Sequence, residues 1–554
     1  MRLSWLLLAC STVACSSNDS PVSPTDGGSD VAVVVEHDDP CGPDPTGLPD
    51  KPVPSTRVST FKSKKAPLAK AGAGGPSEPG PLASYLAQGF GDLEKGPAEE
   101  GVVVDTLLPG AGPSAGKAGR KSVAYIAHLS DLQLIDDESP IRLMKLDNPI
   151  SPGAARPAEA SIALATSAMH RTLAKITASR PFDFELISGD CVDNAQENEI
   201  AWFVDLMDGK AGLHIDSGDD DDPVVGAHND PKDPFDPVPA PAPWFFVFGN
   251  HDVETVGTTV PDDLTRISAI GTEPRNGTRD YRLKGAPSTR ESVPADPKRR
   301  PLVRGEIVQA LQKSTSMPAG HGFAGIAVSG PPANYVVDPI AGVPIRLVQL
   351  DTNDPWGGSD GMVEKKTVDE FLEPVLTKAD TEGRIVILSS HHATTNIDPS
   401  KGLDGPAVPG ALTGKELEAV VAKHPSVVLW LVGHNHINRV RAIAGPSTDA
   451  PGYYEVMTDA IADWPSQARA IELVTLPDGT LSIFMTMIDY EARTCLEERY
   501  RKLTLVDVNS AWSWDGTGAK TDRNVELRRV LPKGVSLAGL GRDKIETETT
   551  LLGK

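Results

Sequence analysis

The sequence predicts an α/β fold for most of the chain, and three observations carry this prediction. Short apolar runs of strand length recur between residues 122 and 432. Segments with apolar residues at helical spacing lie between several of these runs. Further strand-like runs follow from residue 453 to residue 487 without helices between them. Alternating strands and helices indicate an α/β layering, and the closing strands indicate an antiparallel tail.

The N-terminus has the pattern of an export signal. Arg2 precedes an apolar run over residues 3–9, and the residues before Cys10 and before Cys15 each resemble the lipobox of bacterial lipoproteins. Leu7 favours Cys10 as the lipidated residue, whereas the longer signal peptide of residues 1–15 favours Cys15. By the same resemblance, the Ser after either cysteine favours the outer membrane or cell surface over the inner membrane. The alternative is a plain secretory signal, with which the protein would be periplasmic or secreted.

Residues 16–101 are predicted to form a disordered tether, because they are rich in Pro, Gly and Ser and lack sustained apolar periodicity. The folded body is expected over residues 102–545. The formal net charge of −23 argues against a duplex-DNA binder, which needs clustered Lys and Arg. No run of 18 apolar residues follows the N-terminus, so no membrane-spanning helix is predicted. The 5 cysteines show no CxxC pair and no disulfide framework.

Within the body, strands and helices are expected in the following order. The first helix shows the clearest helical spacing, in Ile162, Ala165, Met169, Leu173 and Ile176. Strands are expected at 122–129, 184–188, 244–248, 345–350, 384–389, 427–432, 453–457, 470–474 and 481–487, and helices at 158–179, 197–207, 364–377 and 415–424. Two insertions, at about 208–243 and 253–344, are too long for ordinary connections, so they are expected to be lids or partly disordered.

Polar residues able to bind metals follow directly on five of the expected strands. They are Asp131 and Gln133, then Asp190 and Asp193, then Asn250 and His251, then His391 and His392, and finally His434 and His436. In an open α/β sheet, ligands bind at the carboxyl ends of the strands. Carboxylate, imidazole and amide oxygen are suitable donors for manganese, iron, zinc or magnesium. Two such ions can clamp a phosphate and activate water near neutral pH.

Five motifs resemble, in order, those of calcineurin-like metallophosphoesterases: Asp131-x-Gln133, Gly189-Asp190-x-x-Asp193-Asn194, Gly249-Asn250-His251-Asp252, His391, and Gly433-His434-x-His436. The resemblance covers about residues 121–490, and longer stretches such as residues 463–473 are similar to a subgroup of secreted bacterial members. It implies a four-layer α/β/β/α sandwich, here with the two long insertions and preceded by the tether.

The resemblance also implies roles for the motif residues. Asp190 would bridge two divalent ions, with His251 as general acid and Asp193 orienting His251. The remaining ligands would be Asp131, Gln133 and His436 at one ion and Asn250, His391 and His434 at the other. His392 would be an outer-sphere or substrate-facing residue.

One position departs from the family, which usually has His where this chain has Gln133. An amide oxygen is a harder and weaker donor than imidazole, so the change favours manganese or magnesium over zinc. It also leaves open a mainly mononuclear or slow enzyme.

Other polar residues allow two interpretations each. Arg142 and Lys145 could contact substrate phosphate or form surface ion pairs. His321 could belong to a lid or pack structurally. The acidic run at 219–222 lacks the spacing of an EF-hand and is expected to be a solvated loop.

The motifs therefore predict an exported, metal-dependent phosphoesterase. It would hydrolyse a small phosphomonoester or phosphodiester with metal-activated hydroxide at a two-metal site. The alternative is a surface-binding lipoprotein on a catalytically weakened metallophosphoesterase scaffold, which Gln133 and the insertions motivate. A metallo-β-lactamase-type hydrolase is disfavoured, because the chain contains no HxHxDH string.

Overall fold

The computed structural model describes residues 41, 55–108, 119–177, 180–218, 221–402, 405–537, 539–543 and 545. The expected signal peptide at 1–15, with Cys10 and Cys15, lies outside these residues. The same holds for residues 16–40 and 42–54 of the expected tether.

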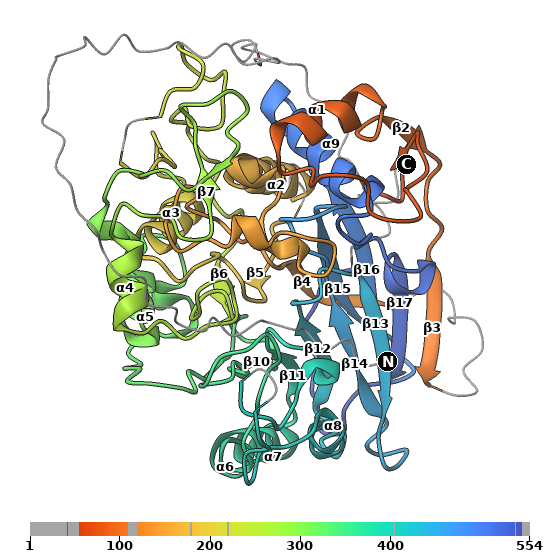
Figure 1. Cartoon of the computed structure of the whole chain (residues 1–554). Coiled ribbons are helices and arrows are strands. Elements are labelled where there is room, and N and C mark those ends of the chain that lie inside the picture. Colours follow the sequence, from red (N-terminus) through yellow and green to blue (C-terminus); the bar gives the residue numbers. More distant parts are fainter. Residues whose placement is uncertain are drawn as a thin grey trace, which may run out of the picture.

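Two large β-sheets form the centre of the molecule (Figure 1). The first has seven strands in the order β3-β17-β16-β15-β4-β5-β6. Strands β4, β5 and β6 are parallel to one another, and β15 is antiparallel to β4. The bounds are β3 Val102–Leu107, β4 Lys121–Leu129, β5 Phe184–Ile187, β6 Trp244–Phe246, β15 Gln467–Thr475, β16 Thr480–Asp489 and β17 Val525–Val530.

The second sheet has six strands in the order β13-β14-β12-β11-β10-β9. Its four central strands, β14, β12, β11 and β10, are parallel, and the two edge strands are antiparallel to their neighbours. The bounds are β9 Tyr335–Val337, β10 Ile345–Gln349, β11 Ile385–Ser389, β12 Val427–Val432, β13 Arg439–Ala444 and β14 Gly452–Met457. Two short pairs lie outside both sheets: β1 Thr60–Ser63 with β2 Leu93–Gly96, and β7 Thr278–Arg279 with β8 Ser288–Thr289.

The α-helices are α1 Pro79–Ala87, α2 Ile162–Ile176, α3 Glu197–Asp208, α4 Asp263–Ala269, α5 Arg304–Leu311, α6 Lys365–Thr367, α7 Glu373–Glu382, α8 Gly414–Val421 and α9 Cys495–Asn509. The single helix expected at 364–377 is α6 and α7 joined by a π-helical stretch, Val368–Leu372. Within the described ranges, no helix has the length and apolar character needed to cross a membrane.

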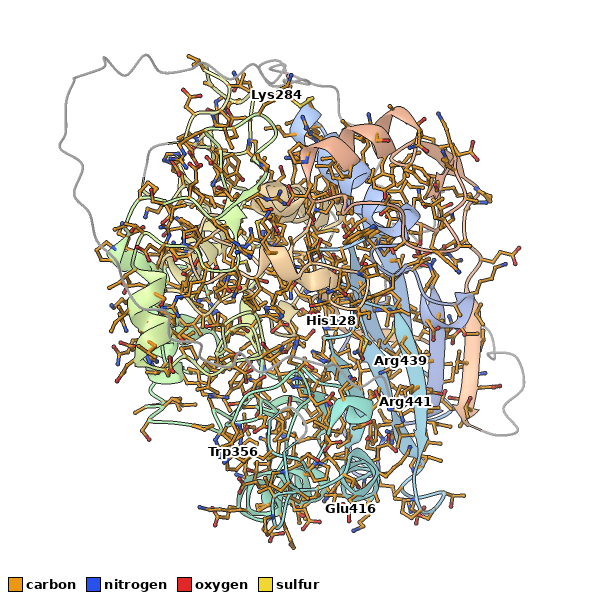
Figure 2. All side chains as sticks on the ribbon, in the orientation of Figure 1. His128, Lys284, Trp356, Glu416, Arg439 and Arg441 are labelled. Atoms are coloured by element: carbon orange, nitrogen blue, oxygen red, sulfur yellow. A yellow bond between two sulfur atoms is a disulfide. The ribbon has the colours of Figure 1, made fainter. Side chains whose placement is uncertain are left out.

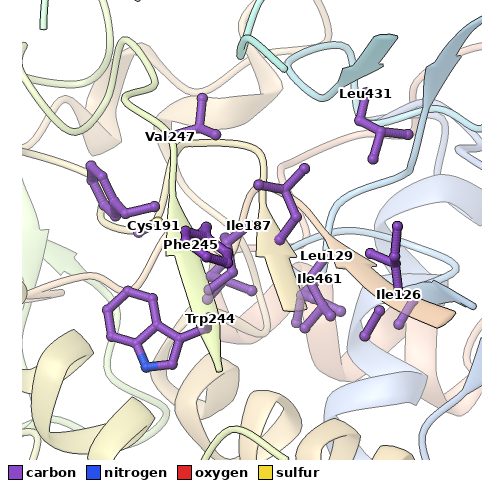
Figure 3. Close-up of a cluster of buried hydrophobic side chains, with 14 of the residues drawn as sticks. Ile126, Leu129, Ile187, Cys191, Trp244, Phe245, Val247, Leu431 and Ile461 are labelled. Atoms are coloured by element: carbon purple, nitrogen blue, oxygen red, sulfur yellow. The ribbon is translucent and has the colours of Figure 1, made fainter. Parts of the chain in front are cut away.

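Alternating side chains show how the layers stack. In β11, Ile385 and Ile387 join the large core cluster shared with the seven-stranded sheet, whereas Val386 and Leu388 pack with residues of α7 and α8. On the seven-stranded sheet, Phe203 of α3 packs against Trp244 of β6 at a ring distance of 5.6 Å. Figure 3 draws part of the shared core, including Ile126 of β4 and Leu431 of β12. Helices therefore cover the outer faces of two packed sheets, so the expected four-layer α/β/β/α sandwich is confirmed.

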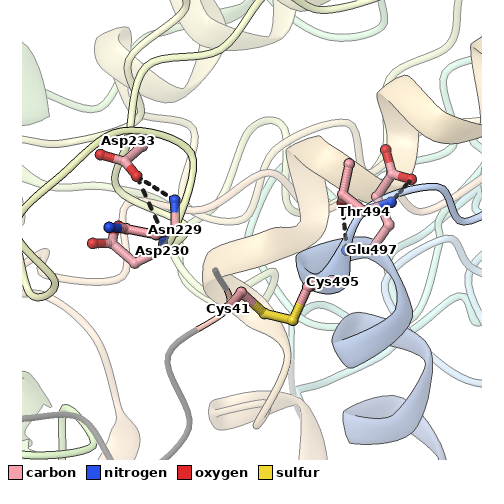
Figure 4. The surroundings of a disulfide bond; sticks show 7 residues. All are labelled: Cys41, Asn229, Asp230, Asp233, Thr494, Cys495 and Glu497. Atoms are coloured by element: carbon pink, nitrogen blue, oxygen red, sulfur yellow. Dashed lines mark hydrogen bonds between the residues drawn. A yellow bond between two sulfur atoms is a disulfide. The ribbon is translucent and has the colours of Figure 1, made fainter. Parts of the chain in front are cut away.

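The prediction of a disordered tether is wrong for residues 55–101. Strands β1 and β2 pair there, and Tyr85 and Phe90 form a small core with Val506 of α9. A disulfide also joins Cys41 to Cys495 at the start of α9 (Figure 4), a pairing that the spacing of the cysteines did not indicate. Composition alone is misleading here, because Tyr85 and Phe90 are buried against α9, which lies far away in the chain.

The described parts of the two insertions are folded onto the body. Arg279 donates to Glu159 at 2.7 Å, and Arg299 donates to Asp136 at 2.9 Å. All four side chains are buried. These buried ion pairs hold the second insertion in place. The composition of the insertion, rich in Pro, Gly and charge, does not reveal them.

Candidate metal centre

The motif residues meet where parallel strands of both sheets end. Strands β4, β5 and β6 deliver them from the seven-stranded sheet, and β11 and β12 deliver them from the six-stranded sheet. The sequence argument placed them at the edge of one open sheet, whereas two packed sheets share the site. Ligand atoms of Asp131, Asp190 and His391 lie within 4.8 Å of one another, and those of His391, His392 and His434 form a second such group.

The backbone is left-handed at five of the predicted ligand positions. The positive φ values are 50° at Asp131, 46° at Gln133, 51° at Asp190, 80° at His434 and 50° at His436. Non-glycine residues seldom adopt this conformation, and it concentrates at functional sites. The left-handed turns after the strands thus direct these side chains towards the same cluster, at a cost in local backbone strain.

Two motif glycines allow loops to approach closely. A Cβ atom at Gly249 would lie 2.1 Å from Oδ1 of Asp190, and one at Gly433 would lie 1.9 Å from Oγ of Ser130. Any side chain at these positions would displace the neighbouring loop. The glycines are therefore required by packing around Asp190 and Asp131.

Asp131 and His436 face each other across the two sheets. The His436 Nε2 atom lies 3.1 Å from Oδ1 of Asp131, and its Nδ1 atom is hydrogen-bonded to Asp463. Asp463 also accepts a hydrogen bond from Nε of Arg156 at 2.9 Å. Burial alone would raise the pKa of Asp463, but the charges of Arg156 and His436 outweigh it and lower the pKa. Asp463 thus orients His436 and stays ionised.

Asp190 and His391 form the centre of the cluster. The His391 Nδ1 atom lies 2.8 Å from the Ser188 carbonyl oxygen, which fixes the ring so that Nε2 faces Asp190 Oδ2 at 3.0 Å and Asp131 Oδ1 at 3.9 Å. All three residues are buried. Two carboxylates and one imidazole nitrogen in this arrangement fit a divalent cation.

The amide residues of the motifs have buried oxygens without hydrogen-bond donors. Oε1 of Gln133 and Oδ1 of Asn250 accept no hydrogen bond from the described residues, although both side chains are only 2% exposed. The Asn250 Nδ2 atom donates to the Gly257 carbonyl at 2.8 Å, which settles which end of the amide is the oxygen. A buried acceptor without a donor costs about 1–3 kcal/mol. A cation at this place would satisfy both oxygens, so the residues present fit the metals that the motifs imply.

His251 is held at the side of the cluster by Asp193. The His251 Nδ1 atom lies 3.0 Å from the Asp193 carbonyl oxygen and 3.2 Å from its Oδ1 atom. Burial opposes a charge on the ring, but Asp190 and Asp193 outweigh burial and raise the pKa of His251 to about 9. The ring is 14% exposed, so its other nitrogen is available to a ligand.

Three residues that the sequence analysis left without a role also shape the site. Asp252 accepts hydrogen bonds from the backbone N–H groups of Asp190, Cys191, Val192 and Gly249, and so joins the loops after β5 and β6. Asp463 and Arg156 support His436. Asp252 directly follows His251 in its motif, and Asp463 begins the stretch 463–473 singled out in the sequence, whereas nothing local marks Arg156, since its partner is distant in the chain.

His392, expected to be an outer-sphere or substrate-facing residue, lies directly beside the predicted ligand His434. Its ring is 4.5 Å from that of His434, and its Nδ1 atom is 2.9 Å from Oγ1 of Thr352. The Nε2 atom is buried and has no hydrogen-bond partner among the described residues. His392 is thus directed into the centre without belonging to the predicted ligand set.

The remaining candidates are structural. Arg142 is buried and paired with Glu159, so it forms neither a surface ion pair nor a substrate contact. Lys145 forms the expected surface ion pair, with Glu78 at 3.9 Å, and also donates to Ser288. His321 stacks on Trp244, which favours structural packing over a role in a lid.

The buried His128, labelled in Figure 2, is hydrogen-bonded at both ring nitrogens, to Ser188 and Thr458. Cys191 is also buried, and burial raises the pKa of its thiol.

Comparison with known proteins finds similarity among solved structures. No protein-family model matches the chain, and no curated protein matches it. Among solved structures, a dimetal phosphatase from Danio rerio is similar at 13% sequence identity with a TM-score of 0.37, over 67% of this chain and 100% of that chain. A likeness at this TM-score carries no argument, so the function is inferred from the site itself.

Proposed function

We propose that the protein is an exported metal-dependent phosphoesterase that hydrolyses a small phosphomonoester or phosphodiester. One observation carries the proposal: the buried, donor-free oxygens of Gln133 and Asn250 stand with the Asp131, Asp190 and His391 cluster at the strand ends. Together with the motifs that resemble those of metallophosphoesterases, this set supports a centre built for two divalent cations.

The ligand assignment follows the motifs. Asp190 would bridge the cations, with Asp131, Gln133 and His436 on one side and Asn250, His391 and His434 on the other. Two carboxylates and two amide oxygens give the centre a hard donor set, which favours manganese or magnesium. When bound, the cations would neutralise phosphate charge and lower the pKa of water.

The chain's own residues then act on the substrate. His251 lies beside the cluster with one ring nitrogen held by Asp193. The other nitrogen is available to donate a proton to the leaving oxygen. Asp193 keeps the ring oriented and favours its protonated form, while Asp463 keeps His436 facing Asp131.

The disulfide supports export. Cys41–Cys495 is a bond that forms and persists mainly in oxidising compartments outside the cytoplasm. The proposed location is the outer membrane or cell surface, through a lipid on Cys10 or Cys15.

The test combines metal analysis with turnover. The protein, loaded with manganese, is assayed with an aryl phosphate monoester and a bis-aryl phosphodiester, and its metal content is measured. We expect about two ions per chain and turnover of at least one ester. We expect Asn250→Ala to lose metal and activity, and His251→Gln to keep metal and lose about 10²–10⁴-fold in rate.

His228→Gln serves as the matched control, because His228 is exposed and outside the centre. It should keep both metal content and rate. A folded protein that binds no metal and turns over neither ester would overturn the proposal and favour a binding lipoprotein on a weakened scaffold.

A further inference from the structure

A second cluster of carboxylates lies between the loop that follows β4 and the first insertion. Carboxylate oxygens of Glu138, Asp216 and Asp221 all lie within 4.8 Å of one another. Glu138 is 4% exposed and Asp216 is 9% exposed. The expectation of a solvated loop at 219–222 is therefore wrong for Asp221, which faces two buried carboxylates.

One carboxylate oxygen of the buried Glu138 lacks a hydrogen-bond donor within the described part of the chain. The atom is Oε2, which accepts no hydrogen bond from the residues that the structure describes. The Lys232 ammonium lies 3.9 Å away, beyond hydrogen-bond distance, and instead donates to Asp137 at 2.7 Å. Burial and the neighbouring carboxylates make a charge on Glu138 costly and raise its pKa to about 10, whereas a bound cation would stabilise the ionised form.

The charges around Glu138 are also unbalanced. Arg299 pairs with Asp136 at 2.9 Å and Lys232 pairs with Asp137, so both buried cations are already engaged. The Glu138 carboxylate therefore shares Lys232 with Asp137 and lies farther from it, at 3.9 Å against 2.7 Å. His214 lies 3.7 Å from Asp216, but its side chain is 29% exposed, so solvent screens any charge it carries.

A neighbouring acidic group shows what a satisfied cluster looks like. Asp222, Asp230 and Asp233 also lie within reach of one another. There the Asp233 carboxylate accepts hydrogen bonds from the backbone of Asn229 and Asp230 (Figure 4). Asp222 is exposed. This second group needs no ion, whereas the group around Glu138 does.

We propose that Glu138, Asp216 and Asp221 bind a calcium ion. Calcium takes oxygen ligands at about 2.3–2.6 Å, so two oxygens on opposite sides of the ion are at most about 5 Å apart. The oxygens of Glu138, Asp216 and Asp221 lie within 4.8 Å of one another, which is inside this span. Three carboxylates suit a hard cation, with water or carbonyl oxygens completing the shell.

The position of the ion gives it a structural role. Glu138 lies five residues after Gln133, and Asp216 and Asp221 belong to the first insertion. The calcium ion would tie this insertion to the loop that carries Asp131 and Gln133. The proposal does not depend on whether the strand-end centre hydrolyses phosphoesters.

The test measures calcium content separately from manganese content. The full chain is dialysed with both ions, and each is quantified per chain by elemental analysis. We expect about one calcium in the wild type, bound at least about tenfold more weakly in Glu138→Gln and in Asp221→Asn. Added calcium should raise the melting temperature of the wild type more than that of either variant.

Asp233→Asn is the matched control and should bind calcium as the wild type does. Unchanged manganese content in the variants shows that the strand-end centre is intact. Should Glu138→Gln fail to fold, the more exposed Asp221→Asn decides alone. Absence of calcium from the wild type, or equal calcium in the wild type and Asp221→Asn, would overturn the proposal.

Discussion

Replacing Glu159 by Gln tests whether a buried ionic cluster holds the second insertion beside the metal centre. The Glu159 carboxylate accepts hydrogen bonds at 2.7 Å from both terminal nitrogens of Arg142 and at 2.7 Å from Nε of Arg279. All three side chains are buried. The substitution preserves shape but leaves two guanidinium groups without their shared counter-charge.

The size of the effect follows from the pKa of the carboxyl group. Burial alone would raise the pKa of Glu159, but the charges of Arg142 and Arg279 outweigh burial and lower it from 4.5 to about 2. This lowering corresponds to about 3 kcal/mol of stability at neutral pH. Removing one partner of a buried ion pair costs about 3–5 kcal/mol in other proteins. We therefore expect Glu159→Gln to lower the free energy of unfolding by about 3 kcal/mol.

The effect should depend on pH with a definite sign. Because the pKa is lower in the folded state, the carboxylate stabilises the fold fully above about pH 4.5 and loses this contribution as the pH falls towards about 2. The difference between wild type and variant should therefore shrink over that window.

Urea unfolding, followed by circular dichroism at neutral pH and at about pH 3, measures both effects. Glu197→Gln is the control, since Glu197 is 49% exposed and pairs with Arg300 at 3.3 Å. It should cost less than about 1 kcal/mol. A loss under about 1 kcal/mol for Glu159→Gln, or one that is equal at both pH values, would refute the reasoning.

Three further predictions concern the centre and the disulfide. Asp463→Asn weakens the support of His436 and should lower metal affinity about 10–100-fold without unfolding the protein, as measured by competition with a chelator. Gln133→His supplies an imidazole and should raise zinc affinity about tenfold relative to manganese, as measured by metal content after dialysis against both ions. Cys495→Ser removes the bond to Cys41 and should lower the free energy of unfolding by about 2–5 kcal/mol in urea. An unchanged affinity, metal preference or unfolding midpoint would contradict the respective prediction.

The central strands and the metal-type residues could be read from the sequence because their signals are local. Strand β12 is an unbroken apolar run, since it is buried on both faces, and its expected bounds agree with the structure. The motif residues follow such strands directly. Helix α9 gave no comparable signal, because it buries charged side chains such as Glu497 and Arg501 together with its apolar ones. Strand β17 gave no clear signal for the same reason, since Arg529 is buried and donates to the backbone carbonyls of Val427 in β12 and Gly452 in β14.

By itself, the sequence determined the layered α/β class, the order of the strands that carry the site and the donor types gathered at their ends. Only the tertiary structure decided that two sheets share the site, that Asp463 and Asp252 orient its residues, and that the supposed tether is folded over residues 55–101. The reason is physical. Local periodicity records which faces are apolar, whereas paired buried charges and disulfides join residues that are hundreds of positions apart, and their partners are known only once the chain is folded.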